Sequence, residues 1–188
     1  MEDRELIRRI QGGQKEYLNV IAEKYYDDIY YFCCYQTGSR EESYDLAQDT
    51  FLRFIRSVDR YRYRNLKGYL LTIAMNLCRT YGSKAGKESA LQEYGGFEIE
   101  KIRDGAEEET EGSYDGDYEV HENSLLLQEA LQKLPDFQRE AVLLHYFYGY
   151  KNREISRMTG ASYGAVKSRV KQGLEKLKQL LDREDFYG

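Results

Sequence analysis

The segment 61–69 interleaves aromatic and cationic side chains: Tyr61, Arg62, Tyr63, Arg64, Lys67 and Tyr69. Stacking of an unpaired base on an aromatic ring contributes about 1–3 kcal/mol, and neighbouring cations neutralise the backbone phosphates. This composition favours binding of single-stranded nucleic acid. The helix predicted after it directs four side chains away from its apolar stripe: Tyr69, Thr72, Asn76 and Arg79. An asparagine there can read the edge of an unstacked base, whereas the alternative is a set of packed tyrosines capped by salt bridges.

A second candidate nucleic-acid site lies near the C-terminus. A short helix over about 152–158, a tight turn at Gly160 and an N-cap at Ser162 lead into another amphipathic helix. Together they predict a helix-turn-helix. With Val166 and Val170 inward, the second helix directs four polar residues outward: Lys167, Ser168, Lys171 and Gln172. These residue types suit phosphates and base edges, and a helical hairpin with a solvated basic face is the alternative.

A candidate protein-docking face follows Tyr44. Four residues occur at positions i, i+3, i+4 and i+7 of the predicted helix: Asp45, Gln48, Asp49 and Leu52. They form one polar, partly acidic face opposite the apolar stripe of that helix. Leu52 is an apolar residue among polar ones, which favours docking of another protein over a merely solvated face.

Helices must position these residues. Apolar residues recur at helical spacing in three stretches, namely Ala47, Phe51, Phe54, Ile55 and Val58, then Leu70, Ile73, Ala74 and Leu77, then Val166, Val170, Leu174, Leu177 and Leu181. Leu134-Pro135 opens a further helix that contains Ala141 to Leu144. No stretch shows the sustained alternation of a strand. The predicted fold class is all-α.

Charge divides the chain into three parts. Its formal net charge is −5, but residues 1–87 and 125–188 are each mildly basic, whereas residues 88–124 are strongly acidic. The acidic stretch contains few aliphatic residues, so it cannot bury enough apolar area to offset the entropy of ordering it. We therefore predict two small helical domains, 1–87 and 125–188, joined by a flexible acidic linker over 88–124.

The composition excludes several classes of protein. Three cysteines and two histidines lack the spacing of metal ligands or of a disulfide framework, so no metal or cofactor is expected. The adjacent Cys33-Cys34 fits helix packing better than a redox pair. No apolar run approaches the ~20 residues of a membrane span, and the charged N-terminus is unlike a signal peptide. The sequence is expected to be cytoplasmic, without membrane insertion.

Several motifs resemble those of bacterial sigma factors, and they occur in the same order. The sequence YDLAQDTFLR at 44–53 resembles the core-polymerase-binding motif of region 2, and GYLLTIAMNL at 68–77 resembles the region 2 helix that reads the −10 element. LPDFQRE at 134–140 and VKSR at 166–169 resemble region 4, and ELIRRI at 5–10 also fits. With only regions 2 and 4 present, the chain resembles an extracytoplasmic-function (ECF) sigma factor of the sigma-70 family.

The resemblance implies a role for each matching position. Core RNA polymerase is bound through its β′ coiled coil and its β flap, and the positions that match the β′-docking motif are Asp45, Gln48, Asp49 and Leu52. The positions that match −10 recognition and strand opening are Tyr61, Tyr63, Lys67, Tyr69, Asn76 and Arg79. The positions that match −35 recognition are Ser162, Lys167, Ser168, Arg169, Lys171 and Gln172. Members of this family are not enzymes, and an anti-sigma protein is an expected partner beside polymerase and promoter DNA.

Two other functions stay open from the residues alone. A stand-alone helix-turn-helix regulator would bind DNA without polymerase and would leave the face around Asp45 without a role. A helical protein-interaction module would carry its basic faces incidentally. Nothing supports a nucleic-acid-processing enzyme, because the sequence has no carboxylate cluster with metal spacing, no histidine constellation and no P-loop.

Overall fold

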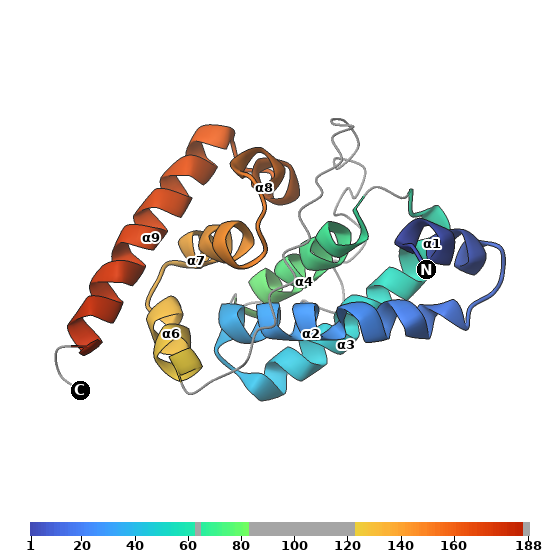
Figure 1. Ribbon diagram of the computed structural model, residues 1–188, viewed down its shortest axis with the longest axis horizontal. Helices are drawn as coiled ribbons and strands as arrows, with labels where there is room; N and C mark the ends of the chain where they lie inside the picture. The colour runs from blue at the N-terminus through green and yellow to red at the C-terminus, as the bar shows by residue number, and fades with distance from the viewer. Residues whose placement is uncertain (63–64, 83–122, 186–188) are drawn as a thin grey trace. The chain divides into compact units, whose positions relative to one another are not determined.

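The computed structural model describes residues 1–62, 65–82 and 123–185. Every regular element in these ranges is helical (Figure 1), which confirms the all-α prediction. The chain separates into two compact units, Met1–Leu91 and Gln92–Gly188. The predicted linker, 88–124, falls almost entirely outside the described residues, so its bounds stay a prediction. No helix in the described part of the chain is long and apolar enough to cross a membrane.

The N-terminal unit consists of α1 (Asp3–Gln11), α2 (Tyr17–Thr37), α3 (Arg40–Ser57), the short 3₁₀ helix η1 (Val58–Arg60) and α4 (Leu66–Gly82). The turn between α2 and α3 has clear causes in the sequence. Gly38 adopts a φ of 75° after α2, and the Ser39 hydroxyl accepts a hydrogen bond of 3.3 Å from the Glu42 amide. Asn65 caps α4 in the same way, because its Oδ1 accepts from the Gly68 amide at 2.9 Å.

The core of this unit lies where α2, α3 and α4 pack together. Its largest fully buried side chains include Ile29, Phe32, Phe54, Leu70, Leu71 and Met75. The predicted stripe of α3 is correct for Ala47, Phe51 and Phe54 but wrong for Ile55, which is 43% exposed. Neighbouring positions of a helix differ by about 100°, so the turn that buries Phe54 carries Ile55 round to the surface.

Helix α1 is tied to the end of α3. The side-chain amide nitrogen of Gln11, Nε2, donates to the Val58 carbonyl at 2.8 Å and to the Tyr61 carbonyl at 2.7 Å. Lys24 of α2 pairs with Asp3 at 2.6 Å, and the Tyr25 hydroxyl donates to the same carboxylate. These contacts fix the backbone at Tyr61, where the aromatic and cationic segment begins.

The C-terminal unit consists of α6 (Asn123–Gln132), α7 (Asp136–Val142), the π-helical turn η3 (Leu143–Phe147), α8 (Asn152–Thr159) and α9 (Tyr163–Asp185). The single helix predicted after Leu134-Pro135 is therefore α7 followed by a π-helical turn. Helices α8 and α9 form the predicted helix-turn-helix. Gly160 has a φ of 73°, and the Ser162 hydroxyl accepts from the Ala165 amide at 3.2 Å, which confirms both the turn and the cap.

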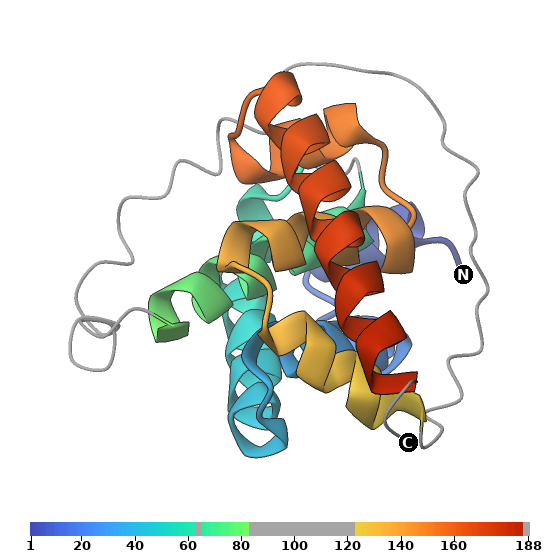
Figure 2. The same ribbon diagram turned by 90° about the vertical axis from the view of Figure 1, so that its left-hand side faces the viewer.

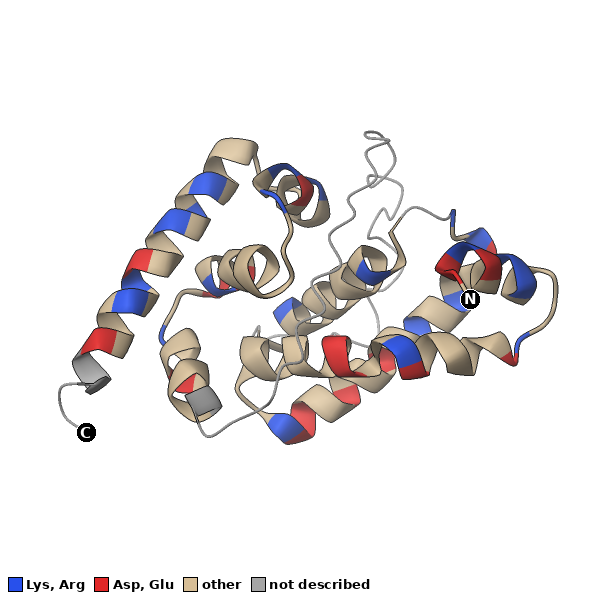
Figure 3. Cartoon of the chain, in the orientation of Figure 1, with Lys and Arg blue, Asp and Glu red and all other residues tan. Residues whose placement is uncertain are grey.

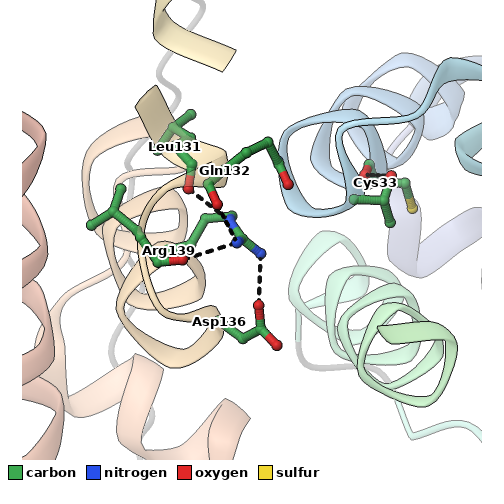
Figure 4. Close-up of polar contacts among 7 residues, drawn as sticks. Cys33, Leu131, Gln132, Asp136 and Arg139 are labelled. Atoms are coloured by element: carbon green, nitrogen blue, oxygen red, sulfur yellow. Dashed lines mark hydrogen bonds and ion pairs between the residues drawn. The ribbon is translucent and has the colours of Figure 1, made fainter. Parts of the chain in front are cut away.

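A buried arginine joins α6 to α7 (Figure 4). Arg139 is 5% exposed, and its guanidinium donates to the carbonyls of Leu131 at 2.9 Å and Leu134 at 3.0 Å. It also pairs with Asp136 at 3.0 Å. The carbonyls at a helix C-terminus have no partner within the helix, so Arg139 satisfies carbonyls at the end of α6 and just after it while its own buried charge is compensated.

Helix α9 packs against α6, α7 and α8, and it runs unbroken past all three (Figures 1 and 2). It comes close to α7 at Gly173, where a Cβ would stand 2.6 Å from Val142 Cγ2 and 3.1 Å from the Gln138 carbonyl oxygen. Only glycine allows this separation. Beside it, Gln138 Nε2 donates to Gln172 Oε1 at 3.2 Å.

The substitution Gly173→Ala should lower the free energy of unfolding of the C-terminal unit. Overpacking costs about 1–3 kcal/mol, which outweighs the ~1 kcal/mol that alanine gains over glycine within a helix. Gly164→Ala is the matched control, because a Cβ at Gly164 meets nothing within 4 Å. Denaturant unfolding of the full chain checks both variants. Equal stability of the two would contradict close packing of α7 on α9.

Candidate nucleic-acid and protein-binding surfaces

Helix α9 has a buried face and an exposed basic face. Val166, Val170 and Leu177 are 1%, 6% and 6% exposed, respectively, and point into the unit. Four predicted contact residues are exposed on the same helix: Lys167, Ser168, Lys171 and Gln172. Figure 3 shows basic residues along α9 and on the neighbouring α8. The predicted division of this helix into an inward and an outward face is confirmed, and the role of the outward face in binding DNA stays a prediction.

Three of the predicted contacts in this unit, Ser162, Arg169 and Gln172, already have partners within the protein. The Arg169 guanidinium lies 4.7 Å from the centroid of the Phe137 ring, which is itself 52% exposed. Gln172 accepts from Gln138 of α7, and the Ser162 hydroxyl is engaged as the N-cap of α9. Arg169 and Gln172 therefore brace α9 against α7 in addition to any contact with DNA.

Tyr163 is a surface residue that the sequence analysis missed. It is the first residue of α9 and is 47% exposed. Arg153 of α8 lies 5.9 Å and Lys167 lies 5.8 Å from the centroid of its ring. The spacing from Tyr163 to Lys167, one helical turn, was visible in the sequence. The contact with Arg153 depends on the turn between the two helices and was not.

Two tyrosines of the 61–69 segment, Tyr61 and Tyr69, are packed in the core. Tyr61 and Tyr69 are 9% and 8% exposed, and their ring centroids are 4.7 Å apart. Both rings meet Phe54 edge-on at 6.3 Å, and the Tyr69 hydroxyl donates to Ser57 Oγ at 2.9 Å. The prediction that Tyr69 lies away from the apolar stripe of its helix is wrong, because this aromatic cluster extends the stripe round to Tyr69. Tyr63 lies outside the described residues.

The other residues predicted to contact the −10 element lie at or near the surface of α4. Asn76 and Arg79 are partly exposed, one turn apart. Lys67 pairs with Asp28 of α2 at 3.0 Å, with both side chains about one third exposed. The Lys67 charge is therefore balanced within the protein and accessible from one side.

The docking face predicted on α3 is exposed as a continuous strip. Asp45, Gln48 and Asp49 are exposed, and Leu52 is 51% exposed. Two further apolar residues extend the strip: Tyr44, 52% exposed, and Ile55, 43% exposed. Neither was among the predicted docking residues, although Ile55 follows Leu52 by three residues. Positions 45, 48, 52 and 55 have the spacing of a coiled-coil seam.

The cysteines belong to the core of the N-terminal unit. Cys33, Cys34 and Cys78 are all buried free thiols. A hydrogen bond with Cys78 and burial raise the pKa of the Cys33 thiol, and burial raises the pKa of Cys34. Because the thiolate is the reactive form, Cys33 and Cys34 act as core side chains. Among the described residues, no group of three or more His, Cys, Asp and Glu side chains could hold a metal ion.

Comparison with known proteins places both units in one family. The family model Sigma-70 region 2 matches residues 21–88, and Sigma-70, region 4 matches residues 124–177. The sequence is 32% identical over 154 residues to the ECF RNA polymerase sigma factor EcfG of Rhodopseudomonas palustris, covering 80% of this chain and 78% of EcfG. The chain belongs to the ECF sigma factors of the sigma-70 family. These are transcription-initiation factors and not enzymes.

Other relatives agree with this placement of the sigma factor. This chain is 29% identical over 180 residues to SigW of Bacillus subtilis, and the alignment covers 94% of this chain and 95% of SigW. It is 28% identical over 179 residues to BldN of Streptomyces coelicolor, but it spans only 65% of the length of BldN.

Two solved structures share the fold of this sigma factor. One is the sigma factor RpoE in complex with the anti-sigma factor NepR from Bartonella quintana, with a TM-score of 0.65 and 24% identity, covering 87% of this chain and 96% of RpoE. The other is CnrH in complex with the cytosolic domain of CnrY, with a TM-score of 0.66 and 18% identity, covering 96% of this chain and 97% of CnrH. At these identities the likeness concerns the fold alone.

The burial of Tyr69 leads to a test in the sigma factor. Tyr69→Ala should lower the free energy of unfolding by about 3–5 kcal/mol, as for other buried aromatic residues. Tyr69→Phe removes only the hydrogen bond to Ser57 and should cost about 1 kcal/mol. Tyr44→Ala is the control, because that ring is exposed and its loss should change stability by less than about 0.5 kcal/mol. If Tyr69→Ala has the same free energy of unfolding as the native chain, the aromatic cluster does not stabilise the core of the unit.

Proposed function

We propose that this sigma factor binds core RNA polymerase and directs promoter-specific initiation of transcription in the cytoplasm. The observation that carries the proposal is that each of the two matched sigma-70 regions contains one exposed face suited to a binding partner. The region 2 match contains α3 and its acidic and apolar strip, and the region 4 match contains the basic face of α9. The first face suits a protein partner and the second suits DNA, which are the two partners that an initiation factor must hold together.

The α3 strip is the proposed contact with the β′ coiled coil of polymerase. A partner helix can pack along the seam formed by Asp45, Gln48, Leu52 and Ile55. Leu52 and Ile55 supply apolar area to bury. Asp45 and Asp49 favour a basic partner surface, and their charge would steer the encounter as well as fix the register of the two helices.

Helix α4 is the proposed reader of the −10 element. Asn76 can read the edge of an extruded base, and Lys67 and Arg79 can contact the strand. Tyr63 remains a candidate for stacking. Tyr61 and Tyr69 are buried in the aromatic cluster, so their proposed part is to hold the start of α4 in place. Extrusion of a base costs a few kcal/mol, and a rigid α4 keeps its polar residues aligned for the bases it must hold.

Helix α9 is the proposed reader of the −35 element in the major groove. Lys167, Ser168 and Lys171 are exposed along one face and provide donors for phosphates and for guanine acceptors. Gln172 and Arg169 lie beside them, braced by α7. The unit that carries α9 is also the proposed contact for the β flap.

An anti-sigma protein is a further proposed partner. Two proteins of the same fold, RpoE and CnrH, are named in complex with NepR and with the cytosolic domain of CnrY, respectively. The exposed apolar residues of α3 and of the C-terminal unit provide surface that such a partner can cover, and covering α3 would block polymerase.

Transcription with purified components tests the proposed function. The chain is mixed with bacterial core polymerase and genomic DNA from its host, and the 5′ ends of the transcripts are mapped. New starts that share two upstream elements are expected. Asn76→Ala should change the preference at one position of the −10 element, and Lys167→Ala with Lys171→Ala should weaken use of the −35 element. A chain that binds DNA alone and adds no starts would instead be a stand-alone helix-turn-helix regulator.

The α3 seam makes a separate prediction about polymerase binding. Leu52→Asp and Ile55→Asp should each weaken the complex with core polymerase at least about tenfold, because each removes burial of an aliphatic side chain and buries a carboxylate in its place. Val20→Asp is the matched control, since Val20 is 42% exposed on α2, outside the seam. Co-elution and titration with core polymerase measure the three variants. Undiminished binding of Leu52→Asp would exclude the seam as the docking site.

A further inference from the structure

The contacts around Tyr163 have a role that neither the sequence motifs nor the family match assigns. Tyr163 begins α9, directly after the Ser162 cap, and its ring is 47% exposed. Two cations from different helices lie over it, Arg153 from the first turn of α8 and Lys167 from the second turn of α9. The ring therefore bridges the two helices of the helix-turn-helix on its exposed side.

Cation–π geometry accounts for this arrangement. A cation within about 6 Å of the centroid is attracted by the negative face of the ring, and arginine and tyrosine are both favourable partners. Arg153 and Lys167 lie at 5.9 Å and 5.8 Å. Both side chains are exposed, and within the described ranges neither forms an ion pair with a carboxylate. Tyr163 is therefore the group that restricts their conformations.

We propose that Tyr163 is a positioning residue that holds Arg153 and Lys167 together as one phosphate-binding and base-binding unit spanning α8 and α9. The inference rests on the proposed function, because the ligand is the duplex DNA that α9 would read. Long cationic side chains lose rotamer entropy when they bind. A ring that restricts them beforehand reduces that loss, and it also keeps the two charges at a fixed separation along the DNA backbone.

The nature of the contact predicts which substitutions are tolerated. Cation–π attraction needs the aromatic face and not the hydroxyl. Tyr163→Phe should bind DNA within about twofold of the native chain, whereas Tyr163→Leu should lose about fivefold, the loss expected for exposed cation–π contacts. Tyr163→Gln is a second variant that keeps a polar, exposed surface and should lose as much as Tyr163→Leu. Tyr146→Leu is the control, since Tyr146 is 49% exposed in the same unit and lies on η3.

Coupling between Tyr163 and Lys167 separates positioning from a general structural effect. The full chain, in complex with core polymerase, is titrated with a promoter duplex taken from the mapped starts. Lys167→Met should lose several-fold less affinity in the Tyr163→Leu background than in the native one, because the ring acts through that cation. Circular dichroism should show the native helix content in every Tyr163 variant.

Three outcomes would overturn the inference. A loss of DNA affinity in Tyr163→Phe as large as that in Tyr163→Leu would show that the hydroxyl, not the ring, makes the contact. Independent losses from Tyr163→Leu and Lys167→Met would show that the two residues act separately, and native affinity of Tyr163→Leu would show that the ring does nothing. The proposed function fails differently, because the native chain would then direct no promoter-specific starts and no promoter duplex would be bound.

Discussion

Close packing of α7 on α9 is the constraint on which the C-terminal unit depends. A single helix must supply the inner wall for α6, α7 and α8 and also present a continuous polar face to the outside. This is feasible because three of its inward residues, Val166, Val170 and Gly173, are small or β-branched and lie at successive turns. Gly173 sets the separation of the helices. Arg139 then fixes α6 to the start of α7, so the position of α9 follows from packing and not from any contact with DNA.

In the N-terminal unit, packed aromatic rings position the start of α4. Helix α4 begins at Leu66, within the aromatic and cationic segment 61–69, and the cluster of Phe54, Tyr61 and Tyr69 joins that start to α3. Gln11 of α1 holds the Tyr61 carbonyl from the other side. The consequence is that the helices carrying the α3 face and the α4 face pack on one shared core.

Periodicity and local turn signals predicted α3, α4 and the helix-turn-helix of α8 and α9, whereas α1, α2 and α6 were not predicted as separate helices. The cap at Ser162, the turn at Gly160 and the inward positions Val166 and Val170 are all set within a few residues of one another. Errors arose where tertiary packing decides. Tyr69 was expected on the side of its helix away from the apolar stripe, but its ring packs with those of Phe54 and Tyr61 in the core. Tyr163 was overlooked for the opposite reason, because its partner Arg153 comes near only after the turn has formed.

The cations of the candidate DNA-binding surfaces share one property, which is that most already have a partner within the protein. Lys67 is paired with Asp28, Arg169 stands over Phe137, and Arg153 and Lys167 stand over Tyr163. A chain with a net charge of −5 has little general attraction for DNA, because non-specific affinity comes from neutralised phosphates. Its basic faces must therefore gain affinity from geometry rather than from excess charge. Aromatic partners suit this purpose better than carboxylates do, since a ring orients a cation without neutralising the charge that the phosphate must meet.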